Sequence, residues 1–292
     1  MRVLLLLLAV IVAAVALVAC SPINALNALV PSDSYERTTV AYGAGARGQL
    51  DVYTPRATAE RVRPANGWPL VVFFYGGSWN RGEREEYRFV GEAFAARGIV
   101  TVIPDYRLYP EVQYPEFLKD SAAAVAWALR EATRLGADPK RVFVMGHSAG
   151  GYNAAMMAFD ARWLGAEGIK PTQLAGWIGL AGAYDFLPIE NPDVKPVFFH
   201  PNSPPESQPI RYVSRAAPRT FLGAAPEDDL INPERNTRQM ASRLQAVGVP
   251  VTLQFYPRTN HLTLIGAVAG PLRFLAPVLD DVVEFVRTAP PR

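Results

Sequence analysis

A serine between small residues is the first feature of this chain that could carry chemistry. Ser148 stands at the centre of the sequence GHSAG (residues 146–150), after an apolar stretch and before small residues that suit a helix. This spacing is weak evidence by itself, because glycine and serine are both common. A serine hydroxyl is a poor nucleophile at neutral pH, so it needs a base, a group that orients the base, and donors for an oxyanion. The rest of the chain therefore decides whether Ser148 is a nucleophile or part of an ordinary Gly-rich turn.

The base must come from one of three histidines. His147 adjoins the serine on the turn, and we expect its side chain to point away. His200 lies in a Pro-rich segment. His261 follows the last predicted strand, where a loop returns to the edge of the sheet that would carry Ser148. We therefore predict that His261 is the base; a histidine of a surface loop is the alternative.

The carboxylate that orients the base is expected between the serine and this histidine, because a strand–turn–helix elbow goes with the order Ser, acid, His. Asp228 and Asp229 follow a predicted strand and precede a predicted helix. One of the two could instead be a solvated acid near the helix start, so these residues alone leave the pair open. Asp185, which follows the preceding strand, is a weaker alternative.

The oxyanion hole requires two backbone N–H groups near Ser148. Ala149, the residue after the serine, supplies one of them. The other is expected from the loop after an earlier strand, where the sequence FYGGSW occupies residues 74–79. Glycine lets the backbone approach a substrate closely, which favours this loop as the second donor. A simple Gly-Gly turn is the alternative.

Alternating strands and helices place these residues at one edge of a sheet. Strands are predicted at residues 35–42, 49–53, 70–75, 99–103, 141–145, 174–180, 220–224 and 251–256, and helices at 83–97, 116–135, 150–159, 233–247 and 277–286. This alternation predicts an α/β fold with a mostly parallel sheet of about eight strands, helices on both faces, and an antiparallel opening pair at one edge. Loops at the carboxyl ends of parallel strands bind ligands in such sheets. Residues 184–218 break the alternation and are rich in proline, so we predict a short insertion there rather than a second domain.

The N-terminus has a separate character. Arg2 precedes an apolar run from Val3 to Ala19, and Cys20 is the only cysteine. This pattern predicts a signal peptide over residues 1–19. The sequence LVAC (residues 17–20) resembles the lipobox of bacterial lipoproteins, and this resemblance implies that Cys20 is lipidated and becomes the mature N-terminus. A signal cut elsewhere and an uncleaved anchor are the alternatives. We expect a tether over residues 20–34 and the folded domain over residues 35–288.

Composition limits the other classes of function. The chain has 292 residues, of which 50% are hydrophobic and 19% charged, which suits one large domain with a full core. The net charge is +2, and no Lys/Arg run is longer than two residues. Binding to nucleic acid is therefore not expected.

Several segments in order resemble the α/β-hydrolase family, in the carboxylesterase branch that includes hormone-sensitive-lipase-like and acetylxylan/feruloyl-type esterases. YGGSW (75–79) is similar to the family's His-Gly-Gly-x-Trp, and DYRLYPE (105–111) to its D-Y-R-L-x-P-E. DPKRV (138–142) precedes the serine motif, and Asn260-His261 fits the terminal histidine. Asp228 stands three residues before Ile231 and five before Pro233, in the register of the family's acid loop D-x-x-V-x-P. The resemblance spans roughly residues 35–288.

The resemblance implies a serine carboxylesterase that acts on small acyl or aryl esters through an acyl-enzyme. It assigns Ser148, Asp228 and His261 to the triad, and the N–H groups of Gly77, Ser78 and Ala149 to the oxyanion hole. It implies no metal and no organic cofactor. Tyr75 replaces the family's usual histidine, which puts the substrate preference near this loop in doubt.

Three alternatives remain for the function. An arylformamidase or a carbohydrate acetyl/feruloyl esterase would keep the same triad, and a hydrolase-like lipoprotein used for binding would not need it. Aromatic residues near the site suggest an apolar acyl or aryl pocket, and some of them would instead pack in the core; they are Tyr75, Trp79, Tyr152, Phe198 and Phe199. With Cys20 lipidated, the enzyme would be bound to a membrane of the bacterial cell envelope and face outside the cytoplasm. Ser21 after the cysteine leans toward the outer membrane in a Gram-negative cell.

Overall fold

The computed structural model describes residues 22–290. The predicted signal peptide and the predicted lipidation at Cys20 therefore lie outside the described residues. None of the helices within residues 22–290 has the length and apolar character that a membrane crossing requires.

A single sheet organises the described chain, with its strands in the order β1-β2-β4-β3-β5-β6-β7-β8. β1 pairs with β2, and β2 with β4, in antiparallel fashion, whereas all later neighbours in this order are parallel. The strands are β1 (Tyr35–Ala41), β2 (Gln49–Pro55), β3 (Trp68–Phe74), β4 (Val100–Pro104), β5 (Ala137–His147), β6 (Gly176–Leu180), β7 (Thr220–Ala224) and β8 (Val251–Phe255). The prediction of a mostly parallel sheet with an antiparallel opening pair at one edge is confirmed.

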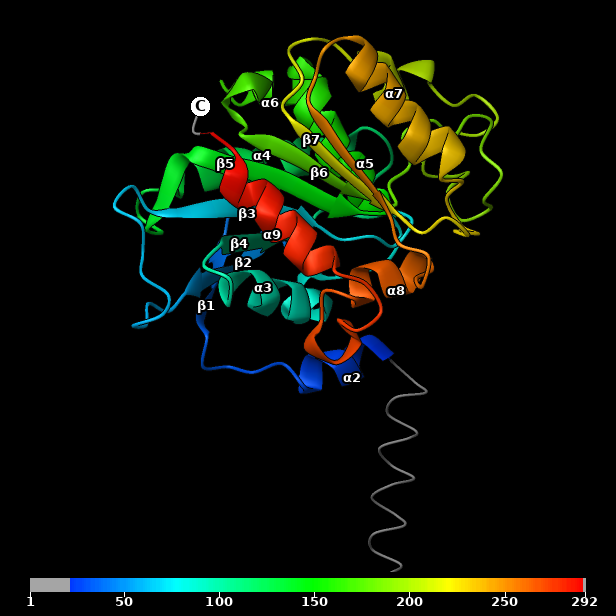
Figure 1. Cartoon of the computed structure of the whole chain (residues 1–292). Helices are drawn as coiled ribbons and strands as arrows, with labels where there is room; N and C mark the ends of the chain where they lie inside the picture. Colours follow the sequence, from blue (N-terminus) through cyan, green and yellow to red (C-terminus); the bar gives the residue numbers. More distant parts are fainter. Residues whose placement is uncertain (1–21, 291–292) are drawn as a thin grey trace, which may run out of the picture.

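Helices lie on both faces of this sheet (Figure 1). α3 and α9 cover one face, and α4, α5 and α6 lie on the other (Figure 1). The α-helices are α2 (Pro22–Ala28), α3 (Arg88–Ala95), α4 (Glu116–Glu131), α5 (Ala149–Phe159), α6 (Ala161–Ala166), α7 (Gln239–Ala246), α8 (His261–Gly266) and α9 (Val278–Thr288). Shorter turns are η1 (Arg84–Tyr87), η2 (Pro171–Gln173), η3 (Pro205–Ser207), η4 (Pro209–Tyr212), η5 (Glu234–Arg238) and η6 (Gly270–Leu272). The predicted α/β class is confirmed.

The central strands are apolar along their whole length because both of their faces are covered. Every residue of β3, β4, β6 and β7 is buried. A strand between two helical layers has no solvated face, so its sequence shows a continuous apolar run instead of alternation. This arrangement buries the strands and leaves the loops at their carboxyl ends free to carry polar groups.

The N-terminal segment is more ordered than a tether. The side chain of Asn27 in α2 donates to the carbonyl oxygens of Glu85 and Glu86, and its Oδ1 accepts from the N–H of Phe89 at the start of α3. Ile23 and Leu26 pack against the hydrophobic core. The structure therefore has a docked helix over Pro22–Ala28 within the segment predicted as a tether, because one asparagine satisfies backbone groups of η1 and α3.

The predicted insertion between β6 and β7 holds no α-helix or strand from residue 184 to 218 and contains only η3 and η4.

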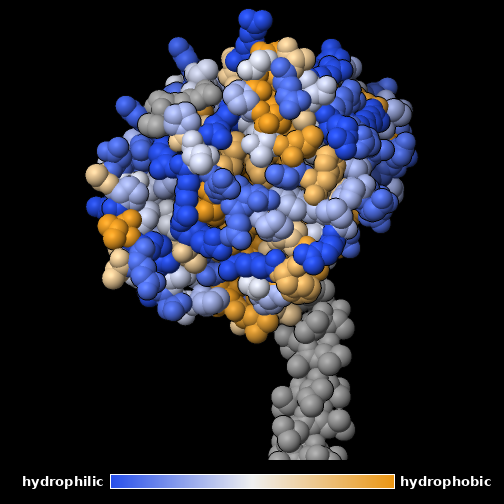
Figure 2. All heavy atoms as spheres, viewed as in Figure 1, coloured by the Kyte–Doolittle hydropathy of each residue, from blue (hydrophilic) through white to orange (hydrophobic). Residues whose placement is uncertain are grey.

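In the view of Figure 2 the surface is largely polar, and apolar residues form separate small areas on this face. Besides α2, two further short helices, α6 and α8, are present that were not predicted. α8 matters for function because it begins at His261.

Candidate active site

Ser148 occupies a sharp turn between β5 and α5. β5 ends at His147, α5 begins at Ala149, and Ser148 itself has φ 56° and ψ −122°. This left-handed backbone is rare for a residue with a Cβ, and such strain concentrates at functional sites. The N–H of Ser148 donates to the carbonyl of Leu180 at 3.0 Å, which fixes the turn to β6.

The two flanking glycines are required by space. A Cβ on Gly146 would lie 2.0 Å from the carbonyl oxygen of Gly150. A Cβ on Gly150 would lie 2.0 Å from the carbonyl oxygen of Phe74, in the neighbouring strand. Because both obstacles are backbone atoms, neither position can accept a side chain without moving the turn. The G-x-S-x-G spacing is therefore explained by how closely β5, α5 and β3 approach one another.

Asp228 and His261 form a buried hydrogen-bonded pair. Nδ1 of His261 lies 2.7 Å from Oδ2 of Asp228. Oδ1 of the same carboxylate accepts from the N–H groups of Leu230 and Ile231, each at 2.9 Å. Burial alone would raise the pKa of the Asp228 carboxyl, but His261 and these two N–H groups outweigh it and hold that pKa below its ordinary value. The carboxylate is thus ionised at neutral pH and oriented toward the imidazole.

The alternative residues lie elsewhere. Asp229 is exposed, and Asp185 pairs with Arg235 at 3.2 Å. His200 is exposed in the insertion. His147 does not line the cavity beside Ser148, but its ring does not leave the site either: its centroid lies 4.8 Å from that of His261. The expectation that this side chain points away is therefore only half right.

Ser148, Ala149, Ser78 and His261 line one cavity of about 280 Å³. The carboxyl ends of β3, β5, β7 and β8 thus bring together a hydroxyl, an imidazole and two of the predicted donors. Gly77, Ser78 and Trp79 have φ values of 125°, 52° and 57°, a left-handed run that turns the loop sharply. The N–H groups of Gly77 and Ser78 have no hydrogen-bond acceptor within residues 22–290. They are free to donate to a substrate oxygen.

The insertion forms the opposite wall of the cavity. Phe186, Ile189 and Val194 contribute apolar surface, and Asp185 and Arg235 contribute a charged pair. Of the five aromatic residues that the sequence suggested, only Trp79 lines the cavity. Tyr75, Tyr152 and Phe198 are fully buried, and Phe199 is exposed. Phe186 was missed, because no motif connects the insertion to the site.

Trp79 is held in place by both polar and aromatic contacts. Its indole N–H donates to Oδ1 of Asn153 at 2.9 Å, and its carbonyl accepts from the N–H of Tyr109 at 2.8 Å. Its ring packs edge-on against Tyr152 and Phe198. The oxyanion loop is thus tied to α5 and to the aromatic core behind it.

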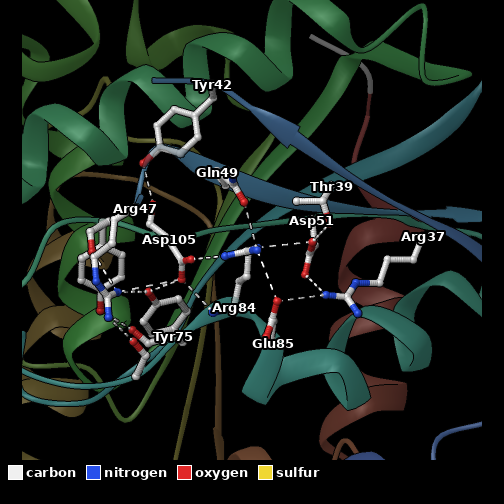
Figure 3. A network of polar contacts seen from close by, with 12 residues as sticks. Arg37, Thr39, Tyr42, Arg47, Gln49, Asp51, Tyr75, Arg84, Glu85 and Asp105 are labelled. Atoms are coloured by element: carbon white, nitrogen blue, oxygen red, sulfur yellow. Dashed lines mark hydrogen bonds and ion pairs between the residues drawn. The ribbon is translucent and has the colours of Figure 1, made fainter. Parts of the chain in front are cut away.

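Tyr75 secures the other end of this loop through the polar network of Figure 3. Its hydroxyl donates to Oδ1 of Asp105 at 2.8 Å, and its carbonyl accepts from the hydroxyl of Tyr106. Asp105 also pairs with Arg84, which lies 3.4 Å from Asp51 (Figure 3). Burial, with help from the neighbouring Tyr106 and Asp105, raises the pKa of the Tyr75 phenol well above its ordinary value. The phenol therefore remains a hydrogen-bond donor at any working pH.

The local signal for α8 was present in the sequence. Oδ1 of Asn260 accepts from the N–H groups of Leu262 and Thr263, and the Thr263 hydroxyl accepts from the N–H of Asn260. This reciprocal cap starts the helix at His261. Asn followed three residues later by Thr is a weaker signature than Ser or Thr followed by Glu, which is why the helix was not predicted.

Within residues 22–290, no group of three or more His, Cys, Asp or Glu side chains could hold a metal ion.

Comparison with known proteins agrees with this geometry. The family model named BD-FAE matches residues 50–192. Carboxylesterase NlhH of Mycobacterium tuberculosis is 32% identical over 254 residues, which cover 80% of this chain and 76% of that protein. The probable isoprenylcysteine alpha-carbonyl methylesterase ICMEL2 of Arabidopsis thaliana is 26% identical over 82% of this chain, which spans only 60% of its length.

Solved structures share the fold. The hyperthermophilic esterase of the archaeon Pyrobaculum calidifontis superposes with a TM-score of 0.72 at 22% identity, over 91% of this chain and 90% of that one. A truncated carbohydrate esterase from gut microbiota superposes with a TM-score of 0.68 at 16% identity, over 88% of this chain and 97% of that one. Fold, site geometry and the similarity to NlhH lead to one conclusion: the chain belongs to the α/β-hydrolase carboxylesterases, in the hormone-sensitive-lipase-like branch.

Proposed function

We propose that this esterase hydrolyses small acyl or aryl esters through Ser148, His261 and Asp228. The observation that carries the proposal is the cavity in which the strained serine and the Asp228-bound imidazole meet. Two features support the role of the serine. Its turn leaves no room for a side chain at Gly146 or Gly150. In the loop beside it, the N–H groups of Gly77 and Ser78 have no acceptor within residues 22–290.

The reaction follows from the placement of each group. The Ser148 hydroxyl attacks the acyl carbon while His261 takes its proton, and the carbonyl oxygen becomes an oxyanion held by N–H groups of Gly77, Ser78 and Ala149. His261 then gives the proton to the departing alcohol, which leaves the acyl group on Ser148. Water, deprotonated by His261, attacks this acyl-enzyme and releases the acid. Asp228 holds the imidazole in the required tautomer and stabilises its charged form.

Turnover of p-nitrophenyl acetate and butyrate tests this proposal, with Ser148→Ala as the matched variant. We expect the variant to lose about 10⁴-fold or more in kcat, because the remaining groups cannot form an acyl-enzyme. Circular dichroism checks that both proteins are folded. Equal rates for the two folded proteins would rule out Ser148 as the nucleophile.

A carbohydrate acetyl or feruloyl ester is the second candidate substrate. The cavity wall carries hydrogen-bonding groups suited to hydroxyls, which are Asp185, Glu190, Asn191, Asn232 and Arg235. The structural similarity to a carbohydrate esterase agrees with this candidate. A panel of p-nitrophenyl acetate, acetylated xylan, methyl ferulate and N-formylkynurenine separates it from simple ester and formamide hydrolysis. Preference for the xylan over the simple acetate would favour the carbohydrate substrate.

We further propose that Cys20 carries the lipid that attaches the enzyme to a membrane of the cell envelope. The docking of α2 supports a short connection, since Ile23, three residues after this cysteine, already packs against the core of the domain. Intact-mass analysis of the protein from a bacterial membrane fraction tests it. An N-terminal cysteine with acyl chains is expected, and a Cys20→Ala variant should leave the membrane fraction.

A further inference from the structure

The residue before the nucleophile has no part in the reaction described above, yet it is a buried polar group. His147 ends β5 and is 3% exposed. It pairs with Leu180 in the parallel register of β5 and β6, which places it in the middle of the sheet. A polar ring in such a position favours a hydrogen-bond partner, because an unpaired buried polar group destabilises the fold.

That partner is the backbone of the catalytic base. Nε2 of His147 lies 2.9 Å from the carbonyl oxygen of His261. A carbonyl oxygen can only accept, so Nε2 carries the hydrogen and donates it. Nδ1 then bears no hydrogen, and it has no hydrogen-bond partner within residues 22–290. The contact therefore specifies one neutral tautomer.

This hydrogen bond connects two parts of the chain that must keep a fixed separation. Ser148 follows His147 directly, so any displacement of the end of β5 moves both residues together. His261 is held at its ring by Asp228 and at its carbonyl by His147. The strand that carries the nucleophile thus also sets the position of the base. We infer that His147 is a positioning residue, which holds His261 at the distance and angle needed to take the proton of Ser148.

The charge state of His147 suits this role. Burial, with the nearby His261 adding to it, lowers the pKa of the His147 imidazole to about 3. The titratable groups that face it are His261 and Asp228. A neutral ring at position 147 leaves His261 as the single imidazole of the site that becomes charged during turnover, and no second positive charge opposes its protonation.

Packing alone offers a competing explanation, because the two rings also lie 4.8 Å apart. Two variants of nearly equal shape separate these roles. His147→Gln keeps an N–H at about the reach of the imidazole Nε2, whereas His147→Met has the same length and no donor. If His147 only fills space, both variants should behave alike.

Steady-state kinetics on p-nitrophenyl acetate between pH 5 and 9 provide the test, and this test rests on the proposed ester hydrolysis. We expect His147→Gln to stay within about 3-fold of the unmodified enzyme in kcat. We expect His147→Met to lose about 10- to 100-fold in kcat with KM within about 2-fold, since misplacing a catalytic group by an ångström costs rates of this order. Equal kcat values for the two variants would overturn the inference.

A second measurement does not depend on activity or on any variant. Nitrogen-15 NMR of the histidine rings in the full, unmodified protein should show His147 with hydrogen on Nε2, none on Nδ1, and no titration down to pH 5. Hydrogen on Nδ1, or a charged ring at pH 6, would overturn the inference even if the enzyme hydrolyses esters. Absence of turnover in the unmodified protein would instead contradict the proposed function, while the ring signals still decide the role of His147.

Discussion

Two groups of residues flank Ser148 and are held in different ways: the acid–base pair Asp228 and His261 on one side, and the oxyanion loop 75–79 on the other. On the acid–base side, Asp228 accepts from N–H groups two and three residues ahead, and Asn260 caps the helix that begins at His261. The long-range bond from His147 adds to this local support. On the oxyanion side, loop 75–79 depends on side chains from distant segments, such as Asp105 and Asn153. The groups that react are therefore built mainly into short local motifs. The groups that shape the oxyanion hole are assembled only by the tertiary fold.

Removing the carboxylate is expected to have the largest effect. Asp228→Asn should lower kcat by about 10⁴-fold, because the amide no longer accepts from Nδ1 in the same way and the imidazole is left in the wrong tautomer. Asp229→Asn is the matched control, because Asp229 is an exposed neighbour outside the pair. We expect its kcat on p-nitrophenyl butyrate to match the unmodified enzyme. Similar losses in both variants would break the assignment of the acid–base side.

The oxyanion side should respond more weakly to a single change. Tyr75→Phe removes the hydroxyl that binds Asp105, and we expect kcat to fall about 10-fold, with KM nearly unchanged, because the loop donors act mainly on the transition state. Tyr75→His, which carries the family's usual residue, should retain more activity than Tyr75→Phe. Steady-state kinetics on a short ester provide both parameters.

Tyr35→Phe is the control for this change. It also removes a buried phenolic hydroxyl, one that accepts from Arg88 in a different part of the molecule. We expect it to lower stability without lowering kcat. If Tyr35→Phe and Tyr75→Phe reduce kcat equally, the network of Figure 3 supports only the fold and not the oxyanion loop.

The smallest effect is a pH-dependent part of the stability. The folded-state pKa of Asp228 lies below its ordinary value, which is near 3.9 in an unfolded chain. The ionised carboxylate therefore stabilises the fold above about pH 4, and this stabilisation is lost as the pH falls through the lowered pKa. We expect Asp228→Asn to reduce the free energy of unfolding by about 1–3 kcal/mol at pH 6, and by less at pH 3. Urea titrations measure this difference; an equal loss at both pH values would contradict the prediction.

Sequence reasoning succeeded where the signal was local or continuous. The continuous apolar run of β3 predicted a strand buried on both faces, and the opening pair was predicted from its alternation and turn. The residues Ser148, Asp228 and His261 were predicted from short motifs at strand ends. The structure brings them to one edge of the sheet, as parallel topology requires.

Apart from α6 and α8, whose caps are local, the misses are long-range contacts. α2 docks on the domain through Asn27, whose partners in η1 and α3 lie about 60 residues away in the sequence, so local residues could not indicate this docking. Phe186 enters the cavity wall only because the insertion folds back over the sheet. The bond from His147 to the carbonyl of His261 joins residues 114 positions apart. Such contacts depend on tertiary packing, which periodicity and propensity do not describe.

The most direct test of the central claim, that Ser148 is the activated nucleophile, is the site of reaction with a fluorophosphonate. The full-length protein would be treated at pH 7.5, its intact mass measured, and its peptides mapped. We expect one adduct, on the peptide that contains Ser148, which is absent in Ser148→Ala and forms much more slowly in Asp228→Asn. An adduct on another residue, or none on a folded protein, would contradict it.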